Sequence, residues 1–256
     1  MRAIILAAGR GLRLHQPANQ EFPKCLLRFG GTTLLERHLR LLDRFGVHEI
    51  VVALGFRHRM VLDELEPLGM RPEIVLNPDF DLGSVLTVHV AAEALTRGGD
   101  VLLMDADVLY HERILALLIQ GSQPVNRLLM DRNLEPGDEP VKVCLKDGVP
   151  IELRKQLIPG LVHDTVGESI GFFRFDESAA KRLAALAAGY VANGRSDLPH
   201  EEAVRDLLQE RQHVFDVADV TGLPWVEVDF AEDVQRAERE ILPRIDLPWK
   251  QAVLEE

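Results

Sequence analysis

Near the amino end, residues 3–14 read AIILAAGRGLRL, and this stretch decides how the rest of the chain is interpreted. The apolar run at 3–8 is short and continuous, and Gly9 ends it. Such a run predicts a central parallel strand that is buried on both faces. The glycines that follow let the backbone approach a ligand closely, and free N–H groups in such a loop can hold phosphate. Because ligands of open α/β sheets bind beyond the carboxyl ends of the strands, we expect a binding site here.

Beyond this stretch, apolar strand patterns alternate with helical patterns through about residue 120. Strands are expected at 49–54, 73–76 and 100–104, and helices at 33–45, 59–68 and 84–95. This alternation predicts an α/β fold with a Rossmann-like, mostly parallel sheet flanked by helices. The second half differs, because short strands at 127–130, 141–145, 151–153 and 170–175 are joined by turns and predict a small antiparallel extension. The sequence also predicts helices at 178–192, 201–209 and 231–242 and a strand at 225–229.

Composition limits the class of protein. The chain has 256 residues and a formal net charge of −12, with 46% hydrophobic and 27% charged residues. These values are typical of a folded globular protein, and the acidic balance argues against a general nucleic-acid binder. Cys25 and Cys144 are not in a metal-binding spacing, so we expect two free thiols in a reducing compartment. No apolar run is long enough for membrane insertion, and we expect a cytoplasmic protein.

The glycine loop does not match the two best-known nucleotide motifs. A dinucleotide fingerprint would need glycine where Leu14 stands, and the chain contains no P-loop pattern. The loop carries cations instead: Arg13, and further on Lys24 in the segment FPKCL. Together these two side chains could neutralise a triphosphate. The alternative is a surface loop with solvated basic residues.

Two acidic motifs follow predicted strands. Asp105 and Asp107 come directly after the strand at 100–104, where residues two apart share one face. Glu227 and Asp229 alternate in the same way near the carboxyl end. Mg²⁺ in proteins favours one or two carboxylates together with substrate phosphates and water, so an acid of the first motif is a candidate ligand, and Asp229, which ends its strand, could supply a second carboxylate. The alternatives are a turn or capping acid at Asp107 and a helix N-cap at Asp229.

Taken together, LAAGRGLRL, PKCLL, the Asp-Ala-Asp motif and WVEVDFAED resemble the nucleotidyltransferases that activate sugars and phospho-alcohols. The resemblance covers roughly residues 2–240 and is closest to the small cytidylyltransferases for phosphocholine, inositol 1-phosphate and aminoalkylphosphonates. It implies a single domain with a nucleotide-binding half (1–125), an acceptor-binding half (126–242) and a tail (243–256). It also implies Mg²⁺ bound by Asp107 and Asp229, and catalytic roles for Arg13 on the leaving phosphates and Lys24 on the α-phosphate and the acceptor phosphate. The implied nucleotide contacts, besides Arg13 and Lys24, are Leu6, Ala7, Ala8, Gly9, Gly11, Gly83, Ser84 and Asp105.

The acceptor is less sharply defined by the sequence. A phosphocholine site would need an aromatic cage, and the segments 138–143 and 198–202 offer no aromatic residue. Lys142, Glu168 and Glu201 would suit a polyol better, and they are the expected substrate-binding residues. We therefore expect transfer from CTP to a small phosphorylated alcohol, with a product used in phospholipid or glycoconjugate biosynthesis.

Two other functions remain open at this point. One is a hexose 1-phosphate nucleotidyltransferase that makes a UDP-, dTDP- or GDP-sugar. The other is a catalytically inactive subunit that senses nucleotide. The sequence also leaves open whether the protein forms a homodimer.

Overall fold

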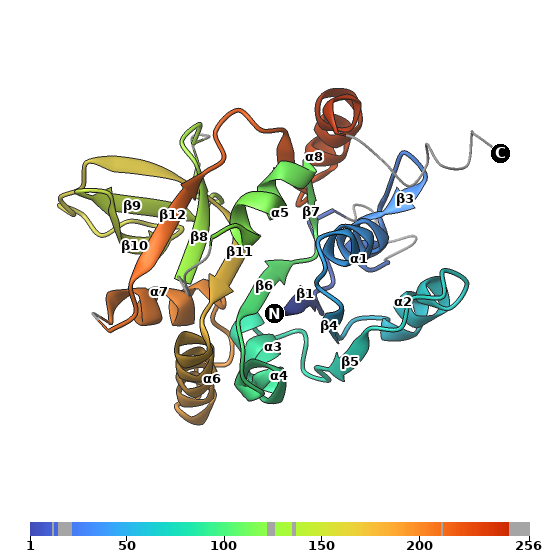
Figure 1. The fold of residues 1–256 in the computed structure, drawn as a ribbon, viewed down its shortest axis with the longest axis horizontal. Coiled ribbons are helices and arrows are strands. Elements are labelled where there is room, and N and C mark those ends of the chain that lie inside the picture. Colours follow the sequence, from blue (N-terminus) through green and yellow to red (C-terminus); the bar gives the residue numbers. More distant parts are fainter. Residues whose placement is uncertain (12, 15–21, 122–125, 135–136, 211, 246–256) are drawn as a thin grey trace.

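A nine-stranded sheet runs through both halves of the chain in the computed structural model, which describes residues 1–11, 13–14, 22–121, 126–134, 137–210 and 212–245. Its main path follows the order β10-β9-β11-β6-β1-β4-β5, and β8 joins β11 to β12 (Figure 1). Strand β1 pairs in parallel with β4 and β6, whereas β11 runs antiparallel to β6, β8 and β9. The predicted α/β fold, a mostly parallel sheet with an antiparallel extension, is confirmed. The strands are β1 (Arg2–Ala7), β4 (Glu49–Leu54), β5 (Glu73–Leu76), β6 (Val101–Asp105), β8 (Asn126–Asp131), β9 (Lys142–Lys146), β10 (Val149–Arg154), β11 (Thr165–Phe175) and β12 (Phe215–Asp219).

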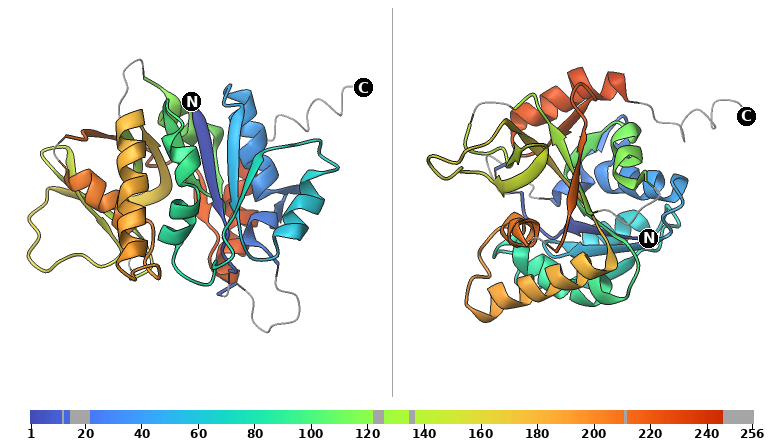
Figure 2. Two further views of the ribbon diagram at one scale, coloured as in Figure 1. Left: turned by 90° about the horizontal axis from the view of Figure 1, so that it is seen from below. Right: turned by 60° about the vertical axis from the view of Figure 1, so that its left-hand side comes forward.

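Helices cover both faces of the sheet, and each face has its own apolar core. On one face, α3, α4, α6 and α7 pack against the sheet; on the other, α1, α2 and α5 do so (Figures 1 and 2). Strand β1 contributes Ile4 to the first core and Ile5 to the second, and both side chains are fully buried. This is why the amino-terminal run is apolar throughout. The helices are α1 (Leu34–Arg44), α2 (His58–Leu65), α3 (Ser84–Val90), α4 (Ala92–Thr96), α5 (Glu112–Ile119), α6 (Glu177–Ala192), α7 (Glu201–Gln209) and α8 (Ala231–Arg236).

Short elements complete the fold. Two small antiparallel sheets lie outside the main one: β2 (Arg28–Phe29) pairs with β3 (Thr32–Thr33), and β7 (Val108–Tyr110) pairs with β13 (Trp225–Glu227). A 3₁₀ turn, η1 (Lys24–Leu26), precedes them in the chain, and α8 continues into the π-helical η2 (Ala237–Ile241) and the 3₁₀ turn η3 (Leu242–Arg244). Residues 246–256 of the predicted tail lie outside the described residues.

Several boundaries differ from the prediction. The single helix expected at 84–95 is two helices, because Ala91 leaves the helical backbone at φ −84° and ψ 7°. The helix expected at 231–242 turns π-helical after Arg236. Strand β12 was not predicted, since its aspartates, Asp216 and Asp219, are residues that strands usually avoid. Within the described residues, no helix combines the length and apolar character that crossing a membrane would need.

Candidate active site

The β7–β13 pair brings the two predicted metal carboxylates together, although they are far apart in the sequence. Asp107 lies immediately before β7, and Asp229 lies two residues after β13. Glu227 pairs with Val108, and the backbone N–H of Val228 donates to the carbonyl of Asp107 at 3.0 Å. The predicted alternative for Asp229, a helix N-cap, does not apply, because Phe230 is the N-cap of α8. The Asp233 carboxylate instead accepts from the backbone N–H of Asp229, which fixes the backbone there.

Three carboxylates meet at this point. Oxygen atoms of Asp107, Glu227 and Asp229 all lie within 4.8 Å of one another. Such a set of hard oxygen ligands fits Mg²⁺, which binds carboxylates and keeps room for water and phosphate. Desolvation and the negative charges of Asp107 and Asp229 raise the pKa of Glu227 well above its usual value, although the residue as a whole is exposed. A cation placed here would relieve that repulsion.

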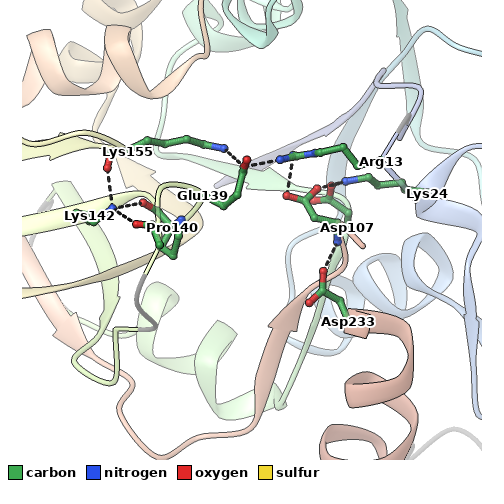
Figure 3. A network of polar contacts seen from close by, with 10 residues as sticks. Arg13, Lys24, Asp107, Glu139, Pro140, Lys142, Lys155 and Asp233 are labelled. Atoms are coloured by element: carbon green, nitrogen blue, oxygen red, sulfur yellow. Dashed lines mark hydrogen bonds and ion pairs between the residues drawn. The ribbon is translucent and has the colours of Figure 1, made fainter. Parts of the chain in front are cut away.

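Two basic side chains face the same carboxylates. The Lys24 ammonium donates to Asp107 Oδ2 at 3.0 Å and also to Asp229 Oδ1. Arg13 donates to Asp229 Oδ2 at 2.7 Å (Figure 3). Burial disfavours the charged form of Lys24, but the carboxylates of Asp107 and Asp229 outweigh burial and raise its pKa. Lys24 is therefore a protonated cation at neutral pH, in a position that suits a phosphate or a metal ion.

The glycine loop frames a hollow beside this cluster. A cavity of about 380 Å³ is lined by Leu6, Ala7, Gly9, Gly11, Arg13, Lys24 and Asp107, with residues 80–82 on its other side. Gly11 has a φ of +64°, and a Cβ there would lie 2.5 Å from the Lys24 side chain. Glycine is therefore required where the loop passes over the lysine. Ala8 is nearly buried, and its carbonyl accepts from the backbone N–H of Phe56 at 3.0 Å.

The remaining predicted nucleotide contacts are Gly83, Ser84 and Asp105, and they lie in a neighbouring cluster of residues around His200. Gly83 is the N-cap of α3, and a Cβ there would lie 2.0 Å from the carbonyl of Leu198. The Ser84 hydroxyl lies 3.0 Å from His200 Nδ1 and accepts from its backbone N–H at 2.8 Å. His200 Nε2 is 3.9 Å from Asp105, and its Nδ1 is 3.2 Å from Glu201. Ser84, Asp105 and Glu201 thus meet at His200, a residue that the sequence did not single out.

A second, larger hollow opens on the other side of the carboxylates. Its volume is about 550 Å³, and its lining includes Glu139, Glu168, Glu227, Asp229 and Phe230. Of the three predicted substrate residues, only Glu168 lies on this wall. Trp225 and Phe230 also line it, which supplies two aromatic residues that the sequence analysis did not assign to an acceptor site.

Lys142 has a different environment. Its ammonium donates to three backbone carbonyls, those of Gly137 at 2.9 Å, Pro140 at 3.3 Å and Lys155 at 2.7 Å. These bonds tie the loop that carries Glu139 to the end of β10. A direct substrate contact of Lys142 stays a prediction.

Sequence reasoning missed Glu139 and Lys155. The Glu139 carboxylate lies between Arg13, which donates to it, and Lys155, whose ammonium donates at 2.9 Å (Figure 3). Both cations lower the pKa of Glu139, Lys155 foremost. The contact joins the glycine loop to the acceptor half across the site. No local sequence pattern could reveal it, since the three residues come from separate segments.

Comparison with known proteins identifies the class. The chain belongs to the family described as MobA-like NTP transferase domain, whose model matches residues 3–155. It is therefore a member of a nucleotidyltransferase family, as its glycine loop, cations and carboxylates led us to expect.

Individual relatives match nearly the whole length of this chain. The chain is 31% identical to the bifunctional IPC transferase and DIPP synthase of Thermococcus kodakarensis, over 93% of this chain and 50% of the relative. It is 28% identical to the CMP-5′-(3-aminopropyl)phosphonate synthase of Streptomyces rubellomurinus, over 95% of this chain and 39% of the relative. The chain thus spans about half or less of the length of these curated relatives. The inositol-1-phosphate CTP transferase from T. maritima has the same fold, with a TM-score of 0.76, 19% identity and 95% coverage of both chains.

Proposed function

We propose that this chain is a Mg²⁺-dependent cytidylyltransferase that joins CTP to a small phosphorylated alcohol, giving a CDP-alcohol and pyrophosphate. The observation that carries the proposal is the cluster of Lys24, Asp107 and Asp229 between two hollows. One hollow has the glycine loop that suits a nucleotide, and the other has room for a small acceptor. The named relatives, which include a CTP transferase for inositol phosphate and a phosphonate synthase that forms a CMP compound, support CTP and this acceptor class.

The chemistry requires that two anions meet. An oxygen of the acceptor phosphate attacks the α-phosphorus of CTP, and the bond from that phosphorus to the bridging oxygen breaks, so that pyrophosphate leaves with the electron pair. An acceptor phosphate is already ionised at neutral pH, so no general base is needed. Catalysis then consists of charge neutralisation and in-line positioning, which are the dominant contributions in phosphoryl transfer.

The chain's own cations divide this work. In the proposal, Lys24 faces the α-phosphate and the incoming acceptor phosphate, and Arg13 faces the leaving pyrophosphate. Asp107 and Asp229, with Glu227, would hold Mg²⁺, which supplies positive charge to the phosphate oxygens when bound. Lys24 and Arg13 must then exchange their carboxylate partners for phosphate oxygens.

Lys155 contacts the wall of the larger hollow from the acceptor half of the chain. Its partner Glu139 lies on the wall of the larger hollow, and Lys155 and Arg13 both donate to the same carboxylate oxygen. Lys155, from the acceptor half, therefore places positive charge next to this wall. We assign Lys155 to the acceptor phosphate, and Arg13 keeps its role on the leaving pyrophosphate. Glu168 on the same wall would accept hydrogen bonds from the hydroxyl groups of a polyol.

Pyrophosphate release in the presence of Mg²⁺ tests the proposal, on a grid of nucleotides and acceptors. The nucleotides are CTP, UTP, dTTP, GTP and ATP, and the acceptors are inositol 1-phosphate, phosphocholine, 2-aminoethylphosphonate, glycerol phosphate and glucose 1-phosphate. Release with CTP and one phospho-alcohol or phosphonate is expected. Release only with glucose 1-phosphate would instead identify a sugar nucleotidyltransferase. Nucleotide binding with no release on the whole grid would contradict the proposed transfer.

A further inference from the structure

Helix α1 contacts the strand pair that carries the candidate metal ligands. Two adjacent polar residues on this helix, Arg37 and His38, are 2% and 0% exposed. Polar side chains with so little solvent contact are costly unless they form hydrogen bonds inside the protein. The function proposed above leaves both of them without a role. Both contact Tyr110, the last residue of β7.

Arg37 holds the backbone at the end of β7. Its guanidinium donates to the carbonyl of Tyr110 from Nη2 at 2.8 Å and from Nε at 3.3 Å. Tyr110 pairs with Trp225 on β13, and the next N–H, that of His111, donates to the carbonyl of Pro224 at 3.0 Å. The end of the strand pair is therefore fixed to α1 by a charged side chain that has little freedom to move.

His38 contacts the side chain of the same tyrosine. Its Nδ1 lies 3.2 Å from the Tyr110 hydroxyl, and the ring of Phe172 packs edge-on at a centroid distance of 5.8 Å. Burial, with the nearby charge of Arg37, lowers the pKa of His38 to about 3, so the imidazole is neutral at physiological pH. The backbone of Ala106 opposes this shift, which places the ring near the residue between Asp105 and Asp107, although Nε2 of the ring has no hydrogen-bond partner among the described residues.

The same helix also contacts the turn that carries the catalytic lysine. Element η1 begins at Lys24, and the backbone N–H of Leu34 at the start of α1 donates to the carbonyl of Leu27 at 3.0 Å. Lys24, Asp107 and Asp229 are thus contributed by segments that meet at one helix. A small rotation of β7 against α1 would alter the spacing of the two carboxylates.

We propose that Arg37 and His38 are positioning residues, which act through Tyr110 and the β7–β13 pair to set the spacing of Asp107 and Asp229 for metal binding. This inference rests on the proposed function for the identity of the metal-ligand site. Groups that hydrogen-bond directly to metal ligands typically change metal affinity about 10- to 100-fold when they are removed. Arg37 and His38 act one step further away, through Tyr110, so loss of either contact should weaken ion binding up to about tenfold, beyond any general loss of stability.

Mn²⁺ binding in the presence of CTP, followed by electron paramagnetic resonance, tests the inference without relying on turnover. The variants are Tyr110→Phe, which removes one hydroxyl, His38→Leu, and His38→Asn, which keeps a polar atom near the position of Nδ1. The Mg²⁺ concentration for half-maximal pyrophosphate release is measured in parallel. We expect the Mn²⁺ dissociation constant and the half-maximal Mg²⁺ concentration to rise severalfold, up to about tenfold, in Tyr110→Phe and His38→Leu, with partial recovery in His38→Asn.

Leu183→Ala provides the matched control. Leu183 is fully buried on α6, in the apolar core on the opposite face of the sheet. This variant should lower Tm at least as much as Tyr110→Phe does and leave ion affinity unchanged. Unchanged Mn²⁺ affinity in Tyr110→Phe and His38→Leu, or an equal loss in Leu183→Ala, would overturn the positioning role. If the wild-type chain binds Mn²⁺ but does not transfer CMP, the proposed function fails. The Mn²⁺ affinities of the variants still decide whether Arg37 and His38 have the positioning role.

Discussion

Replacement of Lys24 by methionine separates its two predicted roles. In the structure, the Lys24 ammonium neutralises Asp107 and Asp229, and both the lysine and Asp229 have side chains only 13% exposed. Methionine keeps the length of the chain and removes the charge. We expect the variant to lose stability without metal, to recover stability with Mg²⁺, and to stay slow in catalysis at any Mg²⁺ concentration.

The magnitude follows from the geometry. One contact of 3.0 Å, at an effective dielectric constant of about 20, corresponds to a gross attraction of about 5 kcal/mol, which the burial of the ammonium partly offsets. Removing one partner of a buried ion pair typically costs about 3–5 kcal/mol, because the other charge is left uncompensated. For a chain of this size the Tm should fall by on the order of 10 °C. Turnover should fall by about 10²- to 10³-fold, as for loss of one group that stabilises transition-state charge.

Differential scanning calorimetry with and without Mg²⁺ measures the stability effect, and pyrophosphate release measures turnover. Lys146→Met is the control, since Lys146 forms an ion pair with Asp164 at 2.9 Å with both side chains more than two-fifths exposed. Exposed pairs contribute about 0–1 kcal/mol, so its Tm should barely change. A Lys24→Met variant that melted like Lys146→Met, or one that Mg²⁺ did not stabilise, would refute the electrostatic reasoning. Turnover near that of the wild type would refute the catalytic role.

Three further changes test other parts of the site. Asp107→Asn should lower turnover by about 100-fold or more while the circular dichroism spectrum is retained; near-normal turnover would contradict the metal assignment. Glu227→Gln should flatten the acid limb of the pH–rate profile and raise the Tm of the metal-free protein at pH 7. Glutamine resembles the protonated carboxyl at every pH. The Glu227 carboxyl, whose pKa is raised on folding, stabilises the fold at low pH, but it loses that contribution as the pH rises through the raised pKa, because its ionised form is repelled by Asp107 and Asp229. A lower Tm at pH 7 would contradict this. Lys155→Ala should raise the KM for the acceptor by roughly tenfold and leave the KM for CTP unchanged, because one charge-assisted hydrogen bond is lost; an equal effect on both would argue against an acceptor contact.

The sequence predicted the central fold and the convergence of its key residues. The apolar run at 3–8 indicated a strand buried on both faces, and Ile4 and Ile5 do enter opposite cores. Lys24 and Asp107 could be placed together because loops at the carboxyl ends of parallel strands meet at one edge of a sheet. Asp229 lies beside them through the β7–β13 pair, which the alternation in WVEVD only partly indicated.

Contacts between distant segments were beyond sequence reasoning. The bridge from Arg13 through Glu139 to Lys155 depends on how the loop at 137–140 is folded back by Lys142, a long-range arrangement with no periodic pattern. His200 and His38 were also missed, because a histidine buried by tertiary packing has the same local sequence as a solvated one. Their roles depend on the neighbours that folding places around them.

The fate of the α-phosphorus of CTP decides whether the chain transfers a nucleotidyl group. With Mg²⁺ and the acceptor found active on the grid, CTP labelled at the α-phosphorus should yield a labelled CDP-alcohol. CTP labelled at the γ-phosphorus should yield only labelled pyrophosphate. The yields of labelled CDP-alcohol and of labelled pyrophosphate should both fall sharply in Asp107→Asn. Label from the γ-phosphorus in the alcohol product, or release of labelled orthophosphate with no transfer to the acceptor, would contradict nucleotidyl transfer at this site.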